Sequence, residues 1–423
     1  MWKYFWCILF SLSDCPTAFT QQSDFHSALR LGQLKTAVAV ATTELNNQPE
    51  NSSAAFRLGA AQFLQTIEQL GQSQYRYGLL GDRRRALPFM RLPIPENDTP
   101  EKLSYEKARA IFQQALNGFN QAEQTLARIK APAAELILTP AAVHLDLNAN
   151  SRPEHSESLL EILSAIMQTP AAESLAPADL TIRFDDADVL WLRGYCHVMA
   201  ALAEIILAHD WKDQFERTAH LFYPSVETPW TFLQNEGPGP LAGFNGQNVL
   251  DLIALIHTTR WDVRDPDGML RALAHLEILP ALSRQSWQLI NAESDNDREW
   301  IPGPTQQAAL NSNLRVTPQM QTQWFTMLDE IELILQGKLL IPFWRGIEGG
   351  FSPFTGDWPA NPELGINARR IFTQPQTFDL LLWIQGTSLQ PWLEKGPQVD
   401  PRKWNSIVSA FQGQFLLFAF WFN

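Results

Sequence analysis

The stretch 185–211, DDADVLWLRGYCHVMAALAEIILAHDW, carries the most regular helical pattern in the chain. Asp185 and Asp186 open it with acidic side chains, which are favourable at the positive end of a helix dipole. No proline interrupts the pattern before Trp211, and apolar side chains cover most of the helical surface. A helix of this kind is buried on most of its sides. We therefore expect it to lie inside a mainly α-helical fold.

Helical patterns recur on both sides of this stretch. Apolar residues three or four positions apart predict further helices over residues 101–130, 247–262, 266–293, 318–336, 377–384 and 404–411. Residues 339–344 and 366–372 instead favour short extended segments. We expect helical hairpins over 19–95, an α-helical middle domain over 96–300 and a mixed, aromatic-rich region over 301–423.

The composition argues against several classes of protein. Hydrophobic residues make up 45% of the 423 residues, which is enough for a large core and excludes global disorder. The formal net charge of −13 argues against nucleic acid or an anionic membrane as the main partner, since both require a basic surface. The chain contains no nucleophile elbow, phosphate-binding loop, dinucleotide fingerprint or helical zinc motif. A non-enzymatic role is therefore favoured over catalysis.

The first 18 residues have the pattern of an export signal. Lys3 forms a short basic region, Tyr4 to Leu12 form an apolar run that is too short to span a bilayer, and Ala18 suits a cleavage site. A lipid-modified Cys15 and a buried first helix are the alternatives. We predict an exported protein that is periplasmic or extracellular.

A polar stripe runs along the helix predicted at 185–211. Asp186, Arg193, His197 and Glu204 are seven, four and seven residues apart, which places them on one side of an otherwise apolar helix. Asp186, His197 and Glu204 are candidate catalytic residues of a hydrolase-type enzyme, in which His197 and Glu204 act as an acid–base pair or line a ligand cleft. The alternative is a solvent-exposed edge or a buried network of paired side chains.

A second polar segment, DLNANSRPEHSE at 146–157, carries oxygen-bearing side chains at its first, third, fifth, ninth and twelfth positions. Calcium prefers six to eight oxygen ligands, and this spacing wraps a short chain around one ion. The segment resembles the calcium loops of EF-hand and dockerin proteins. The resemblance implies a ligand set of Asp146, Asn148, Asn150, Glu154 and Glu157, with the backbone carbonyl of Arg152.

Two positions depart from the pattern of those calcium loops. Ser151 replaces the glycine that permits a sharp turn at the sixth position, and Pro153 replaces the apolar residue through which two loops pair. An unpaired loop with three acidic side chains implies weak, structural calcium binding of the kind that extracellular modules show. The alternative is an Asx-rich turn that uses the same residue types to cap the following helix.

Small residues near the N-terminus follow the pattern of a helical repeat. Gly32, Ala41 and Pro49 are followed by the pair Leu58-Gly59. These spacings resemble tetratricopeptide repeats over about residues 21–65, where small residues let paired helices approach and proline ends a helix. The resemblance implies hairpins that stack on the next helices and offer a surface to another protein or peptide. An ordinary helical hairpin is the alternative.

The chain ends in an aromatic segment, from Phe415 to Phe422. We expect it to be a buried strand or helix, whereas its exposure would favour contact with a membrane or an envelope partner. The sequence as a whole predicts an exported, helical binding or scaffold protein with a structural calcium-like site. A hydrolase-type enzyme and an envelope-associated protein are the alternatives.

Overall fold

The computed structural model describes residues 16–81, 91–130, 134–167, 180–234, 246–294, 296, 299–309, 315–345, 364–411, 415, 418 and 419. Helices dominate these residues and the strands between them are short, which confirms the predicted mainly α-helical class. Residues 1–15, and with them most of the predicted export signal, lie outside the described ranges.

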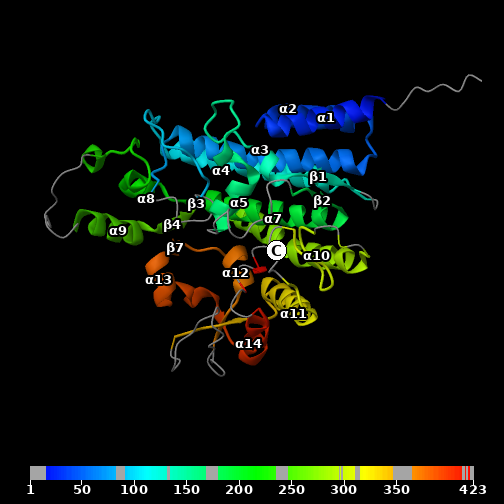
Figure 1. Ribbon diagram of the computed structural model, residues 1–423. Coiled ribbons are helices and arrows are strands. Elements are labelled where there is room, and N and C mark those ends of the chain that lie inside the picture. The colour runs from blue at the N-terminus through cyan, green and yellow to red at the C-terminus, as the bar shows by residue number, and fades with distance from the viewer. Residues whose placement is uncertain are drawn as a thin grey trace, which may run out of the picture.

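The helix α7 (Asp186–Ala208) lies in the middle of the stacked helices (Figure 1). Asp185 accepts a hydrogen bond from the N–H of Ala187, and Asp188 completes a capping box by accepting one from the N–H of Asp185. Within the described ranges, α7 is the one helix long and apolar enough to cross a membrane. Half of its apolar stretch is buried by neighbouring helices, as expected for the core helix of a globular fold.

The first four helices stack in chain order (Figure 1). They are α1 (Pro16–Arg30), α2 (Leu34–Asn47), α3 (Ser52–Arg76) and α4 (Tyr105–Leu126), and α4 packs on α7. Gly32 has a positive φ of 66° in the tight turn between α1 and α2. Asn51 caps α3 by accepting a hydrogen bond from the N–H of Ala54. Stacked helical hairpins have this order, and the tetratricopeptide resemblance stays a prediction.

The connection from α4 to α7 crosses one side of this stack. It contains β1 (Leu136–Leu138), the 3-10 turns η2 (Pro140–Ala142) and η3 (His155–Glu157), α5 (Leu159–Met167) and β2 (Ile182–Phe184). β1 and β2 pair antiparallel, with Leu136 opposite Phe184. This pairing returns the chain to the start of α7. The segment 146–157 lies between η2 and α5 and ends in η3.

The chain beyond α7 adds a second group of helices and two small antiparallel sheets. The elements are β3 (His209–Asp210), α8 (Lys212–Thr218), η4 (Ala219–Leu221), η5 (Thr231–Gln234), α9 (Gly246–Thr258), β4 (Arg260–Val263), α10 (Pro266–Ala292), α11 (Pro318–Leu335), β5 (Ile341–Pro342), β6 (Gly365–Ile366), α12 (Ala368–Thr373), β7 (Phe378–Asp379), α13 (Leu380–Gln385), η6 (Thr387–Trp392), β8 (Leu393–Glu394) and α14 (Pro401–Ala410). The sheet orders are β3-β4-β7 and β5-β6-β8.

Two predicted elements differ from the structure in this part of the chain. The helix expected over 247–262 ends at Thr258, because the following residues pair as β4 with β3 and β7. The extended segment expected over 366–372 is mostly α12, because Asn367 caps a helix there by accepting a hydrogen bond from the N–H of Arg370. In both places, a contact with a neighbour outweighed the local apolar pattern.

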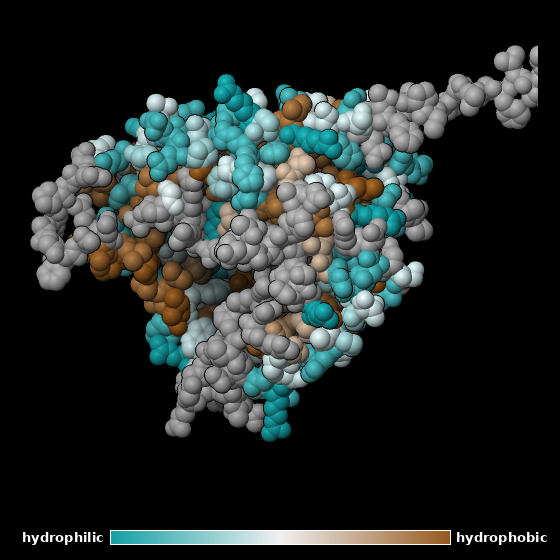
Figure 2. Space-filling model, in the orientation of Figure 1, coloured by the Kyte–Doolittle hydropathy of each residue, from teal (hydrophilic) through white to brown (hydrophobic). Residues whose placement is uncertain are grey.

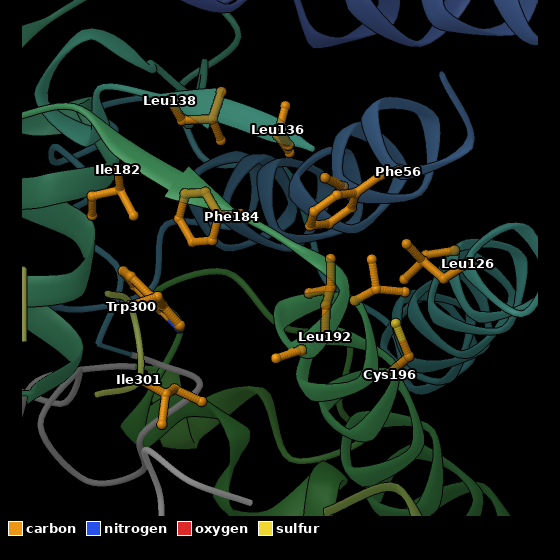
Figure 3. Close-up of a cluster of buried hydrophobic side chains, with 14 of the residues drawn as sticks. Phe56, Leu126, Leu136, Leu138, Ile182, Phe184, Leu192, Cys196, Trp300 and Ile301 are labelled. Carbon is orange, nitrogen blue, oxygen red and sulfur yellow. The ribbon is translucent and has the colours of Figure 1, made fainter. Parts of the chain in front are cut away.

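One continuous hydrophobic core joins the N-terminal, middle and C-terminal parts of the chain. Figure 3 shows Phe56 of α3 and Leu126 of α4 gathered with Leu192 and Cys196 of α7. Burial raises the pKa of the Cys196 thiol well above its ordinary value, so this cysteine is a packing residue.

The C-terminal aromatic segment is described only in part, and its described phenylalanines are buried. Phe415 is 9% exposed and Phe418 is 2% exposed. The Phe418 ring lies 4.5 Å from that of Phe411 and 5.7 Å from that of Trp324, between ring centroids. These two side chains belong to the core and are not available to a membrane or partner.

An apolar face remains exposed on α9 and α13. It includes Val249, Leu252 and Ile253 of α9 and Leu382 and Ile384 of α13, each between 44% and 66% exposed. Figure 2 shows hydrophobic residues gathered on this flank of the molecule. Neighbouring exposed apolar side chains of this kind are typical of interaction surfaces.

Candidate functional site

The segment 146–157 is a loop whose two ends are held together by backbone pairing. The N–H of Leu145 donates to the carbonyl of Glu157, and the N–H of Leu159 donates to the carbonyl of Val143. Between them, His144 and Ser158 form an antiparallel bridge. The entry to the loop is therefore extended, as the proline at residue 140 predicts. This backbone pairing brings the first and the last predicted calcium ligands, Asp146 and Glu157, close together.

The loop is anchored on α3. The N–H of Asp146 donates to Oε2 of Glu68 over 2.8 Å, and Nε2 of Gln72 donates to the carbonyl of Asp146 over 2.8 Å. Leu147 is fully buried against Gly71, where an added Cβ would lie 2.5 Å from Leu147 Cδ2. Glycine at residue 71 is thus required for the loop to lie this close to the helix.

The polar side chains at the start of the loop turn inward onto its own backbone. The Asp146 carboxylate accepts hydrogen bonds from the N–H groups of Asn150 and Ser151, each over 3.0 Å. Oδ1 of Asn148 accepts from the N–H of Asn150, and Oδ1 of Asn150 accepts from the N–H of Arg152. These bonds hold the oxygens of the first, third and fifth positions along the inner side of one tight turn.

Two residues of this turn have left-handed backbone. Ala149 has φ of 58° and Ser151 has φ of 59°. Ser151 is the position at which the family of calcium loops has glycine, and the chain adopts the left-handed conformation there without it. A residue with a Cβ is strained in that region by about 1–2 kcal/mol.

Glu157 is the chemically most unusual residue of the loop. Its side chain is fully buried, Oε1 accepts a hydrogen bond from the N–H of Leu147 over 2.9 Å, and Oε2 has no hydrogen-bond partner among the described residues. The pKa of Glu157 is raised to about 7, chiefly by burial and also by the charges of Glu154 and Asp146, while the backbone N–H groups of Leu147 and Asn148 lower it. A buried carboxylate oxygen without a donor is costly unless a proton or a cation meets it.

Glu68 of α3 extends this acidic group, and the sequence did not point to it. The pKa of Glu68 is raised to about 7, chiefly by burial and also by the charges of Asp146 and Glu157, against the lowering effect of the hydrogen bond from Asp146 N–H. No Lys or Arg within the described ranges forms an ion pair with Glu68 or Glu157. Glu68 lies 78 residues before Asp146 in the chain, so no local pattern links the two.

The predicted ligands are therefore brought together in one loop, although not as a completed cage. Asn150 Nδ2 donates to Oε1 of Glu154 over 2.7 Å, which draws the ninth position towards the fifth. In the part of the chain that the structure describes, no three His, Cys, Asp or Glu side chains group as metal ligands. The carboxylates of Asp146, Glu154 and Glu157 therefore do not converge on one point in this structure, and the calcium site stays a prediction.

The three candidate catalytic residues on α7 do not meet. The helix rises about 1.5 Å per residue, so Asp186 and Glu204 are separated by roughly 27 Å along its axis. Asp186 accepts a hydrogen bond from the N–H of Ala134 over 3.0 Å. Glu204 accepts two from Arg271, over 2.8 and 2.9 Å. Each end of the stripe therefore has its own partner, and the stripe contains no single reaction centre.

The middle of the stripe is a buried network of paired groups. Nδ1 of His197 lies 2.8 Å from Nδ1 of His275, and Nε2 of His197 lies 3.5 Å from Oε1 of Glu123. Arg193 donates two hydrogen bonds to the same Glu123 oxygen. The His197 ring and the Arg193 guanidinium together hold the pKa of Glu123 at about 2, and burial lowers the pKa of His275.

No protein-family model, curated protein or solved structure matches this chain.

Proposed function

We propose that this protein is a helical binding and scaffold protein in which one calcium ion, bound by the loop 146–157, joins the loop to the N-terminal helices. The observation that carries the proposal is the buried Oε2 of Glu157, which has no hydrogen-bond donor among the described residues. A cation at the centre of the loop would supply the missing partner. The ion would be structural, because it would lie where the loop is anchored on α3.

The charges around Glu157 support a cation in preference to a neutral partner. Asp146, Glu154 and Glu68 all lie close enough to influence the same small region. Carboxylates in one region repel one another when they are charged, and a divalent cation would reduce this repulsion while coordinating several oxygens at once. A proton can neutralise only one of the carboxyl groups.

The proposed ligands are those implied by the calcium-loop resemblance. Carboxylate oxygens come from residues 146, 154 and 157, amide oxygens from residues 148 and 150, and a backbone carbonyl from residue 152. Glu68 stays outside this set, since it holds the N–H of Asp146 and contributes negative charge from α3. Calcium would thereby link the end of the 136–145 segment, the start of α5 and α3.

Weak calcium binding suits an exported protein. A single loop with serine at its sixth position is expected to bind calcium with a dissociation constant on the order of 1 mM, the range of extracellular modules. The predicted export signal would deliver the protein to a compartment where calcium reaches that concentration. The exposed apolar face on α9 and α13 supports the binding role, since it offers a surface for a protein partner.

A calcium titration followed by thermal unfolding tests the proposal. At tenfold excess over the dissociation constant, calcium should raise the free energy of unfolding by about 1.4 kcal/mol. For a chain of this length that corresponds to a Tm increase of roughly 2 °C over the protein in chelator. Magnesium should have a smaller effect, because it requires a more regular octahedral geometry than a flexible loop provides.

Two substitutions make the titration specific. Glu157→Gln keeps the acceptor for Leu147 N–H but removes the charge, so the calcium effect should disappear. Glu161→Gln is the matched control, because Glu161 lies on α5 outside the loop and pairs with His155. Identical melting in calcium, magnesium and chelator would contradict the proposal, as would an undiminished calcium effect in Glu157→Gln.

A further inference from the structure

A polar groove lies beside the C-terminal half of α7, between α4 and the start of α10. Its volume is about 580 Å³. Arg109, Asn117 and Asn120 line it from α4, Glu204 from α7, and Arg264, Asp265 and Arg271 from the β4–α10 junction and α10. Pockets of this size hold ligands of about the size of a monosaccharide.

Three guanidinium groups line this groove, and they are engaged to different degrees. Arg109 donates to the carbonyls of Leu207 and His209 over 2.7 and 2.8 Å, so it is held by the C-terminal end of α7. Arg271 is held by Glu204 and by Asp265, which accepts from its Nη2 over 2.8 Å. Both side chains are therefore fixed in place before any ligand arrives.

Arg264 is the exception among the three. Its backbone N–H donates to the carbonyl of Ala208, but its guanidinium donates no hydrogen bond to any other residue that the structure describes. Its charge lowers the pKa of Asp210 from a distance beyond that of an ion pair. A free guanidinium offers five N–H donors in a planar arrangement that matches a carboxylate or a phosphate.

The remaining donors of the groove point to the same ligand chemistry. Arg271 uses Nε and Nη2 for its carboxylate partners and leaves Nη1 without a described acceptor. On α4, Asn117 accepts a hydrogen bond from Gln113 and keeps its own amide N–H groups, while Asn120 makes no side-chain hydrogen bond within the described ranges. Amide side chains both donate and accept, which suits hydroxyl groups.

From this arrangement we propose that the groove binds a small hydroxylated anion, such as a sugar acid or a sugar phosphate. Arg264, assisted by Arg271, binds the anionic group, and Asn117 and Asn120 of α4 bind hydroxyl groups. The buried Glu204 carboxylate orients Arg271. The proposal deepens the binding role proposed above by naming a ligand class, and it does not require calcium.

Isothermal titration calorimetry on the full chain tests this inference, with D-glucuronate, glucose 6-phosphate and glucose as probes. At least one of the two anions should bind, and glucose should bind at least about tenfold more weakly. Binding of glucuronate alone identifies a carboxylate ligand, and binding of glucose 6-phosphate alone identifies a phosphate ester; either result supports the groove. Raising the salt concentration should weaken anion binding.

The matched variants are Arg264→Gln and Arg260→Gln. Arg264→Gln should weaken anion binding by about tenfold, whereas Arg260→Gln should leave it unchanged, because Arg260 is exposed on β4 and does not line the groove. Both positions are exposed, so circular dichroism should report an unaltered fold. Anions that bind no better than glucose, or equal losses in both variants, would overturn the proposal. A chelator should leave anion binding unchanged. Failure of the calcium proposal can therefore be distinguished from failure of the anion-binding proposal.

Discussion

Two of the glutamates that this molecule buries, Glu44 and Glu157, lie in contrasting surroundings, and only Glu44 meets a cation. In the helical hairpin of α2 and α3, Glu44 is 3% exposed and accepts two hydrogen bonds from Arg57, one of them over 3.0 Å. In the loop 146–157, Glu157 is fully buried, accepts a hydrogen bond from the N–H of Leu147, and otherwise meets the N–H of Asn148 and further carboxylates. The hairpin neutralises its own charge, whereas the loop depends on a proton or a bound cation.

The difference shows what each kind of segment can supply. α2 and α3 are regular helices whose facing side chains keep a fixed register, so one arginine lies opposite one glutamate. The loop is a short irregular segment that uses its polar side chains to satisfy its own N–H groups. A buried glutamate that is paired with an arginine makes the stability of its region independent of solution conditions. A buried glutamate without a cation makes the stability of its region sensitive to pH and to ions.

The largest expected effect tests the buried pair. Arg57→Met should lower the free energy of unfolding by about 3–5 kcal/mol, because it leaves the Glu44 carboxylate buried without a cation. Urea unfolding followed by circular dichroism measures this loss. The double variant with Glu44→Met should recover most of it, since a buried pair is replaceable by apolar side chains of similar volume. A single-variant loss below about 1 kcal/mol would remove the contrast with the loop.

The next effect is a pH dependence that belongs to the loop. Glu157 and Glu68 have pKa values of about 7 in the folded protein against an ordinary value of 4.5. Between these values the folded protein binds more protons than the unfolded chain, so stability should fall as pH rises from 4.5 to about 7 and then level off. We expect a loss on the order of 2 kcal/mol in chelator, measured by urea unfolding between pH 5 and pH 8.

Two comparisons isolate the loop from other titrating groups. The loss should be smaller in Glu157→Gln, whose side chain has no proton to lose in this range. It should also be smaller in calcium, because a bound cation compensates the carboxylates once they are charged. A wild-type curve parallel to that of Glu157→Gln across this pH range would rule out a perturbed carboxyl group at this position.

The smallest effect concerns the backbone of the loop. Ser151→Gly should raise the free energy of unfolding by about 0.5–1 kcal/mol, since glycine relieves the left-handed strain but adds freedom to the unfolded chain. The same substitution should also strengthen calcium binding, because glycine favours the left-handed backbone that the turn requires. Ser156→Gly is the matched control: it lies in the 3-10 turn η3, where φ is negative, so glycine should destabilise it slightly. A loss of stability in Ser151→Gly equal to that in the control would contradict the strain argument.

The elements that were predictable from sequence were those with long periodic patterns. The predicted helix at 266–293 corresponds to α10, and the one at 318–336 corresponds to α11. The acidic start predicted at residue 185 is the observed cap of α7. The short elements were predicted less well: β4 depends on strands far along the chain, and the cap that starts α12 was not recognised in the apolar pattern.

The candidate site divides in the same way. The loop 146–157 was identifiable because its oxygens follow one another at short spacing, and local hydrogen bonds bring them together. The stripe of Asp186, His197 and Glu204 was a regular pattern as well, but a helical face extends along an axis and so separates residues that share it. No sequence pattern pointed to Arg264, because its proposed role in the groove depends on its position relative to Arg271 and to α4.

The amino-acid sequence by itself determined the helices with long periods, their caps, the acidic balance and the polar loop, since each depends on residues near one another in the chain. Only the tertiary structure decided that Glu44 meets Arg57, that Glu157 and Glu68 face the same acidic region, and that three arginines share one groove. The physical reason is the difference in the sequence distance over which these interactions act. Backbone hydrogen bonding and apolar periodicity act over a few residues, whereas burial and charge pairing depend on which distant side chains the packed helices bring together.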